Sequence, residues 1–203
     1  MNKRNIIIFL CLILFLIIGL YVIKIDGNVI DNTVYNFIIS FKSKYTTLFF
    51  KGVTFLSSVS FMVVVSILLL LVKKIKYRKL MLINIILDVI LNTCLKYIFR
   101  RERPRDIMMV IENGFSFPSG HTMLATIFYG FIIYLIYKSD KSRKFKYVSI
   151  ILLSLLILLI GISRIYLGVH YTTDVLGGYL ISVSYLMVFI YYIEKKNLLE
   201  KMK

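Results

Sequence analysis

Only two histidines occur in the 203 residues, and both lie beside residue types that bind phosphate. His121 ends the tetrapeptide PSGH at 118–121, while His170 lies between Arg164 and Asp174. One imidazole can attack phosphorus while the other protonates the leaving oxygen. The two sequences therefore predict an enzyme that transfers a phosphoryl group.

The stretch from Arg164 to Asp174 has a clear chemical logic. Asp174 follows His170 by four residues, the spacing of one helical turn. Its carboxylate can accept a hydrogen bond from one imidazole nitrogen, which fixes the tautomer and leaves the other nitrogen free to attack. Arg164 offers a fork of N–H donors for phosphoryl oxygens. We expect these three side chains to act together.

The tetrapeptide at 118–121 predicts the start of a helix. Proline is suited to the first helical turn, because the N–H that it lacks would have no partner there. The backbone N–H groups of Ser119, Gly120 and His121 would then point at an anion. Gly120 permits close approach of a phosphate oxygen, and the Ser119 hydroxyl adds a donor.

Lys96 and Arg103 place two more cations at the end of an apolar segment. Asn84, Asp88 and Asn92 precede Lys96 at intervals of four residues and so share one helical face. Polar residues at membrane depth usually face the interior of a helical bundle. We therefore expect these three residues to form interhelical hydrogen bonds that position Lys96.

Apolar residues make up 59% of the chain, which is typical of a membrane protein. A bilayer core of about 30 Å requires about 20 apolar residues per helix. Six segments qualify, at 5–23, 48–72, 80–99, 119–137, 147–163 and 174–193. A signal peptide is the alternative for the first, but the only alanine is Ala125 and the segment is long and uniformly aliphatic, so we expect a retained helix. The pattern predicts an all-α bundle of six transmembrane helices, in a single domain over 1–203.

The net charge of +16 is distributed in a way that favours a membrane topology rather than a nucleic-acid partner. Sixteen of the 26 basic residues lie in clusters that alternate with the spans, at 3–4, 73–79, 138–146 and 195–203. The positive-inside rule places these clusters and both termini in the cytoplasm. The remaining basic residues on the opposite side include Lys96, Arg100, Arg101, Arg103, Arg105 and Arg164. Because their charge opposes the topological bias, we expect them to bind an anion at the outer face.

The loop between the first two spans contains helical periodicity. Val34, Phe37, Ile38 and Phe41 recur at helical spacing, and Asp31, Asn32 or Thr33 can serve as the N-cap. This pattern predicts a short helix within 31–45 that lies in the outer interface. Such a helix could line a lipid entrance or simply pack at the surface.

The three motif stretches together resemble the signature of the type 2 phosphatidic acid phosphatase/haloperoxidase superfamily. The resemblance covers 96–174 and rests on Lys96-x6-Arg103-Pro104, the tetrapeptide PSGH and Ser163-Arg164-x5-His170-x3-Asp174. It implies that His170 is a nucleophile that forms a phosphohistidine, with Asp174 as its orienting partner and His121 as general acid. The implied ligands of the phosphoryl oxygens are Lys96, Arg103, Ser119, Gly120 and Arg164. It also implies catalysis without a metal or cofactor, and the few acidic residues form no evident Mg²⁺ cluster.

A lipid phosphate phosphatase of the plasma membrane, with its site outside, is the function that these features favour. A haloperoxidase is disfavoured because those relatives are soluble. A non-catalytic lipid-binding or transport protein is the alternative. Transport would require ionisable residues near the membrane midplane, whereas most of these cluster at one interface. A lipid substrate is favoured because Met108, Met109, Phe115 and Phe117 flank the site.

Several substrates and the oligomeric state stay open. Undecaprenyl diphosphate, phosphatidylglycerophosphate, phosphatidate and diacylglycerol pyrophosphate all fit the pattern. The surplus charge of Arg100, Arg101 and Arg105 could accommodate a diphosphate or attract any anionic lipid. Cys11 and Cys94 lie within apolar spans, where we expect buried packing.

Overall fold

The structure, a computed structural model, describes residues 2–24, 28–72 and 77–201 and contains no strand in these ranges. Within them, six helical segments are long and apolar enough to cross a membrane. These are Lys3–Lys24 (α1), Lys44–Leu71 (α3 and α4), Arg78–Phe99 (α5), Gly120–Lys138 (α6), Arg143–Tyr166 (α7) and Thr172–Lys195 (α8). The predicted all-α bundle is therefore confirmed.

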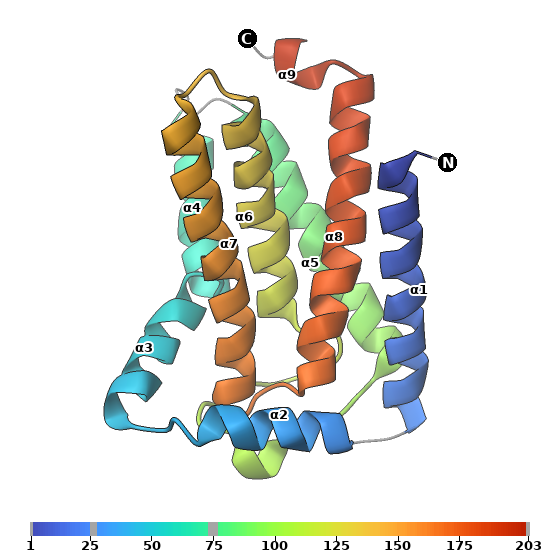
Figure 1. The fold of residues 1–203 in the computed structure, drawn as a ribbon, viewed down its shortest axis with the longest axis vertical. Coiled ribbons are helices and arrows are strands. Elements are labelled where there is room, and N and C mark those ends of the chain that lie inside the picture. Colours follow the sequence, from blue (N-terminus) through green and yellow to red (C-terminus); the bar gives the residue numbers. More distant parts are fainter. Residues whose placement is uncertain (1, 25–27, 73–76, 202–203) are drawn as a thin grey trace.

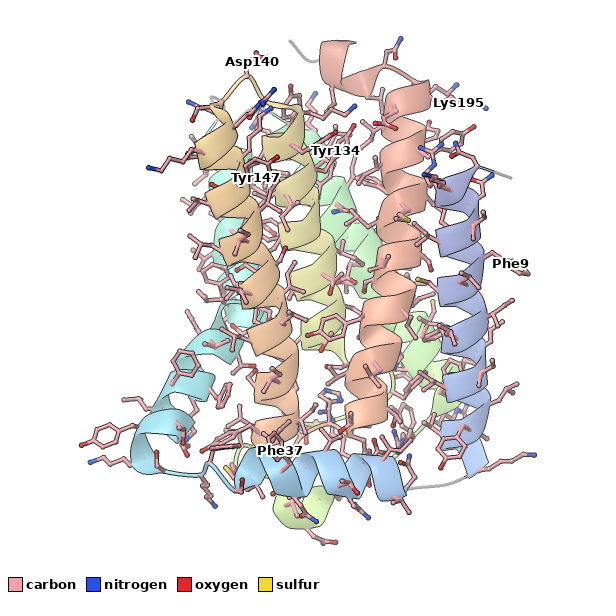
Figure 2. The ribbon with its side chains drawn as sticks, viewed as in Figure 1. Phe9, Phe37, Tyr134, Asp140, Tyr147 and Lys195 are labelled. Carbon is pink, nitrogen blue, oxygen red and sulfur yellow. The ribbon has the colours of Figure 1, made fainter. Side chains whose placement is uncertain are left out.

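Helix α6 forms the centre of the bundle and packs against α5, α7 and α8 (Figure 1). Ala125, Ile127 and Met123 are completely buried there. Helix α1 packs against α8, and its outer side is apolar: Phe9, which points away from the bundle in Figure 2, is 57% exposed. An apolar outer surface over helices whose backbone groups are paired internally is what a lipid environment requires.

The second predicted span, 48–72, is not one continuous helix. The structure has α3 (Lys44–Phe55) and α4 (Val59–Leu71), and α3 diverges from the bundle in Figure 1. The break is stabilised locally, because Ser58 caps α4 by accepting from the N–H of Phe61. The carbonyl of Leu56 accepts a 2.7 Å hydrogen bond from the Tyr129 hydroxyl on α6, which satisfies a group that the break leaves free.

The predicted short helix exists as α2 (Val29–Ile39), which lies across the ends of α7 and α8 in Figure 1. Its N-cap is Asn28, whose side chain accepts from the N–H of Asp31 at 2.9 Å. The predicted N-cap at positions 31–33 is therefore wrong. Asp31 lies in the first turn and is buried, while Phe37 is 66% exposed.

Both described ends of the chain lie at one end of the bundle, together with Asp140 and Lys195 (Figures 1 and 2). The described parts of the four basic clusters share this end, whereas Lys73, Lys74, Lys76 and Lys203 lie outside the described residues. The opposite end contains α2, the beginnings of α6 and α8 and the end of α7. All three motif stretches meet there, as the order of the spans predicts.

The prediction that both cysteines are buried is wrong for Cys94, which is exposed on α5, while Cys11 is half-buried. Both thiols are free.

Candidate active site

A cavity of about 270 Å³ joins the three motif stretches. Lys96 reaches it from α5, His121 from the first turn of α6, and His170 from the turn between α7 and α8. Arg103 and Glu112 reach it from the segment between α5 and α6. The cavity also extends to Val59 and Val89, which are 75% and 53% exposed on the outside of α4 and α5. It therefore opens towards the surface that lipid would cover.

The segment before α6 is held by hydrogen bonds at both of its ends. The N–H of Ser116 donates to the carbonyl of Arg101 at 2.8 Å, and the Asn92 amide donates to the carbonyl of Pro118 at 3.2 Å. Helix α6 begins at Gly120 with Ser119 as N-cap, so Pro118 precedes the cap and does not lie in the first turn as predicted. These contacts place His121 at the wall of the cavity.

Close packing of α8 brings its first turn against this segment. A side chain at Gly177 would collide with the ring of Phe117, and one at Gly178 would press on the first turn of α6. The two glycines therefore allow the approach that brings Asp174 to Ser116.

A tight turn positions His170. Gly168 has a φ of +66°, and a side chain there would collide with the carbonyl of Ile107. The carbonyl of Arg164 then accepts from the N–H groups of Val169 and His170 at 3.2 and 3.3 Å. The backbone of this turn thus fixes the nucleophile candidate relative to α7.

His170, Asp174 and Ser116 form one buried hydrogen-bonded group. Nδ1 of His170 lies 3.4 Å from Oδ2 of Asp174 and 3.3 Å from Oγ of Ser116, and the Ser116 hydroxyl donates to the same Oδ2. His170 precedes α8, so the contact does not arise from the predicted helical turn. Asp174 instead folds back from the first turn of α8, where its Oδ2 also accepts from the N–H of Tyr171.

The hydrogen bonds also identify the tautomer of His170. Nε2 lies 3.2 Å from a guanidinium nitrogen of Arg103, which can only donate, so Nε2 accepts and Nδ1 carries the proton. Burial and the charges of Arg103, Arg164 and Lys96 lower the pKa of His170 well below its ordinary value of 6.5. The imidazole is therefore neutral at pH 7, with its lone pair on the nitrogen next to Arg103.

Hydrogen bonds hold the cations Arg103 and Arg164 in place at the site. Arg103 donates to the carbonyls of Val169, Asn113 and Gly114 at 2.9 to 3.2 Å. Arg164 is 1% exposed and donates to the Thr54 hydroxyl of α3 at 2.7 Å. Its Nε has no hydrogen-bond partner within the described ranges, which leaves a donor available.

Glu112 is a site residue that the sequence argument missed. Its carboxylate lies 2.5 Å from Arg164 and 3.8 Å from Arg103, so it contacts two guanidinium groups assigned to phosphate. It therefore partly neutralises both cations. The sequence offers no local signal for this role, since Glu112 is one of three acidic residues in the same loop.

Two predicted contributions differ in the structure. The N–H of Ser119 donates to the carbonyl of Asp174 at 3.1 Å and is therefore not directed at an anion, although Gly120 and His121 line the cavity. Phe117 does not flank the opening, because it is completely buried against Phe15 and Phe99.

The polar stripe of α5 is confirmed at two of its three positions. Asn84 donates to the carbonyl of Ile127 and accepts from Tyr185, and Asn92 holds Pro118. Asp88 is buried and lines the cavity, but its Oδ1 has no hydrogen-bond partner in the described parts of the chain. The predicted interhelical bond of Asp88 is thus absent there.

Arg101 is not surplus surface charge, as the sequence suggested. Its side chain is completely buried and forms ion pairs with Asp174 at 2.7 Å and with Asp31 at 2.9 Å. By contrast, Arg105 is 77% exposed and pairs only loosely with Glu102 at 3.7 Å. The sequence does not reveal this role of Asp31 either, since its pattern indicates only a helix cap.

No group of three or more His, Cys, Asp or Glu side chains in the described ranges could hold a metal ion. Lys96, Arg103, His121 and His170 line the cavity together with two carboxylates, and the cationic and imidazole groups suit an anion.

Known proteins resemble this chain in sequence and in fold. Residues 77–198, more than half of the chain, match the family model of the PAP2 superfamily. Phosphatidylglycerophosphatase B of Bacillus subtilis is 42% identical over 123 residues, which is 56% of this chain and 58% of that protein. The chain thus spans less than two thirds of that relative.

Two crystal structures have a similar fold. The first transmembrane PAP2 type phosphatidylglycerolphosphate phosphatase from Bacillus subtilis is 30% identical, with a TM-score of 0.81 over 96% of this chain and 98% of the other. Aquifex aeolicus LpxE is 25% identical, with a TM-score of 0.61 over 83% of this chain and 99% of the other. Six apolar helices and this likeness indicate a multi-pass membrane protein. The chain belongs to the PAP2 superfamily.

Proposed function

We propose that this protein is a metal-independent lipid phosphate phosphatase that acts through a phosphohistidine. The observation that carries the proposal is the convergence of His170, His121, Lys96 and Arg103 on one cavity that reaches the apolar surface. Cationic donors in a partly buried site stabilise charge that develops in the transition state. The relatives named for phosphatidylglycerophosphate support the same class of reaction.

In the first step, Nε2 of His170 attacks phosphorus and a nitrogen–phosphorus bond forms. The bond from phosphorus to the leaving oxygen breaks, and His121 gives its proton to that oxygen. Asp174 stabilises the positive charge that develops on His170. Arg103, Arg164, Lys96 and Gly120 bind the phosphoryl oxygens, and Glu112 releases the guanidinium groups when the substrate phosphate displaces it.

In the second step, water attacks the phosphohistidine. His121, now neutral, accepts a proton from this water, and the nitrogen–phosphorus bond breaks. Inorganic phosphate leaves, and His170 returns to its starting tautomer. The same histidine thus acts first as acid and then as base.

The lining of the cavity favours a glycerol-containing substrate. Asp88 and Asn92 present polar atoms deeper in the bundle than Lys96, and Oδ1 of Asp88 lacks a partner in the described part of the chain. A glycerol hydroxyl of phosphatidylglycerophosphate can supply the missing hydrogen bond. The polyprenyl chain of undecaprenyl diphosphate has no hydroxyl to offer, so we place phosphatidylglycerophosphate first.

We expect purified protein in detergent to release phosphate from phosphatidylglycerophosphate in the presence of EDTA, because cationic side chains replace a metal. Undecaprenyl diphosphate, phosphatidate and diacylglycerol pyrophosphate should be poorer substrates. Vanadate should inhibit competitively, since it reproduces the trigonal-bipyramidal transition state. The measurement is phosphate release across this panel.

Arg164→Lys should weaken vanadate binding and turnover together, because lysine cannot replace the bidentate guanidinium. Lys42→Arg, on the exposed connection between α2 and α3, is a control with the reverse exchange. In the EDTA experiment on the wild type, loss of activity with recovery in Mg²⁺ would show that the proposed metal-independent mechanism is wrong.

A non-catalytic lipid-binding or transport protein is the second candidate. Asp88 is a buried ionisable residue at mid-helix depth, as transport would require. The other charged side chains that line the cavity, Lys96, Arg103 and Glu112, lie at one end of the bundle, which favours catalysis. Binding of lipid without release of phosphate from any member of the panel would favour this candidate.

We further propose that the site faces the outside and that both termini are cytoplasmic, from the positive-inside rule. Ser119 and Thr172 are buried, so Ile111, which is 92% exposed near the site, is the better outer reporter. In a background without Cys11 and Cys94, a cysteine at Ile111 should react with an impermeant thiol reagent in intact cells. One at Ser142, in the turn before α7, should react only after permeabilisation. The opposite labelling pattern would place the chemistry at the inner leaflet.

A further inference from the structure

Arg101 is enclosed by two carboxylates and an aromatic ring at the rear of the site. One guanidinium nitrogen donates to Oδ1 of Asp174 and to the Thr173 hydroxyl, both at 2.7 Å, and the other donates to Oδ2 of Asp31 at 2.9 Å. The guanidinium carbon lies 4.0 Å from the ring centroid of Tyr171. Arg101 therefore joins α2 to the first turn of α8.

The two oxygens of Asp174 have separate partners. Oδ1 binds Arg101, whereas Oδ2 binds Ser116, His170 and the N–H of Tyr171. The pair with Arg101 thus fixes the orientation of the carboxylate so that its other oxygen faces the imidazole. Arg101 does not itself line the cavity, so it acts on the substrate only through Asp174.

Asp31 completes the group from the other side. Its carboxylate accepts from the N–H and hydroxyl of Thr173 at 2.8 and 3.0 Å and from the Asn28 amide at 2.8 Å. Burial disfavours the charge of Arg101, but Asp174 and Asp31 outweigh this effect and raise the pKa of the guanidinium. Asp31, Arg101 and Asp174 form a charged group whose side chains are at most 1% exposed.

We infer that Arg101 and Asp31 are positioning residues for the phosphatase reaction, and that they hold the Asp174 carboxylate with Oδ2 towards His170. Helix α2, which carries Asp31, thereby helps to position Asp174 and does not only pack against the end of the bundle. This inference rests on the proposed role of Asp174. A buried charged group in which every member is paired can fix one orientation of a side chain.

Arg101→Gln should lower kcat by about 10²-fold, because a displaced Asp174 misorients the nucleophile. KM and vanadate affinity should change only a few-fold, since the ligands of the phosphoryl oxygens are unchanged. The kcat of Arg101→Lys should lie between those of the wild type and Arg101→Gln, because one ammonium cannot reproduce the two-sided fork of the guanidinium.

The kcat of Asp31→Asn should fall less than that of Arg101→Gln, since the pair between Arg101 and Asp174 remains. Arg4→Gln, which removes the Arg4–Glu194 pair at the other end of the bundle, should retain the wild-type kcat.

A double-mutant cycle with Asp174→Asn separates positioning from a general structural effect. In the Asp174→Asn background, Arg101→Gln should add little further loss, because its target is already disabled. An equal loss in both backgrounds, or a folded Arg101→Gln protein with wild-type kcat, would overturn the inference while leaving the proposed function intact. Wild-type turnover in Asp174→Asn alone would instead overturn the role of Asp174, and this inference with it.

Arg101→Gln leaves two buried carboxylates without their cation, which can prevent folding. The double variant Asp31→Asn/Arg101→Gln removes one charge of each sign and is the version to measure in that case. Its thermal unfolding in detergent should resemble that of the wild type, while its kcat stays low. A double variant that folds and turns over like the wild type would also refute the positioning role.

Discussion

His170→Asn should abolish phosphate release, because His170 is the one imidazole lining the cavity in the described part of the chain that contacts the Asp174 carboxylate, which stabilises the product charge. Asparagine keeps a polar side chain of similar reach but has no basic lone pair. With a phosphorus-labelled lipid substrate, the wild type should form an acid-labile, alkali-stable phosphoenzyme, and the variant should form none. The amount of labelled protein is measured in reactions stopped after milliseconds to seconds, and steady-state turnover is measured in parallel.

Two controls make this result specific to the nucleophile. Inorganic phosphate should still bind His170→Asn, since Lys96, Arg103 and Arg164 remain. The wild type should stay active below pH 6.5 and lose activity only as the pH falls through the lowered pKa of His170, because protonation removes the attacking lone pair. Turnover or a stable phosphoenzyme in the His170→Asn protein would refute the phosphohistidine mechanism.

The general plan of this molecule follows from local sequence features. Apolar length locates the six spans, and the order of the spans brings His121, Arg164 and His170 to one end without any knowledge of the fold. The break between α3 and α4 escapes such reasoning, because 48–72 has only one charged residue, Lys51, and is long enough for a single span. Ser58 and the distant Tyr129 hydroxyl together stabilise the break, and only the first of them is a local signal.

The residues behind the site were harder to predict than those within it. Arg101 lies 70 positions from Asp31 and 73 from Asp174, and these contacts depend on how α2 crosses the ends of α7 and α8. Composition alone made Arg101 look like one of several surface arginines. Glu112 and Ser116 similarly acquire their roles from the path of the segment before α6. Long-range ion pairs leave no periodic trace in a sequence.

His121→Ala should lower turnover of the lipid substrate by about 10²- to 10⁴-fold, the usual contribution of one acid–base group. A bound phosphate brings negative charge next to His121, and this charge favours the imidazolium that must donate the proton. His121→Asn should lower turnover as much as His121→Ala does, because both variants lose proton transfer and the volume of the side chain does not matter. The comparison is made by steady-state phosphate release.

The nature of the leaving group provides the decisive test of His121. With p-nitrophenyl phosphate, whose leaving group needs no proton, the first step should be nearly normal in the His121 variants. The second step still needs a base to activate water, so phosphohistidine should accumulate on His170 and appear as a burst of p-nitrophenol followed by slow turnover. The double variant His121→Ala/His170→Asn should give neither burst nor label. Equal losses for the lipid and the p-nitrophenyl substrate, with no accumulated phosphoenzyme, would show that His121 binds substrate but transfers no proton.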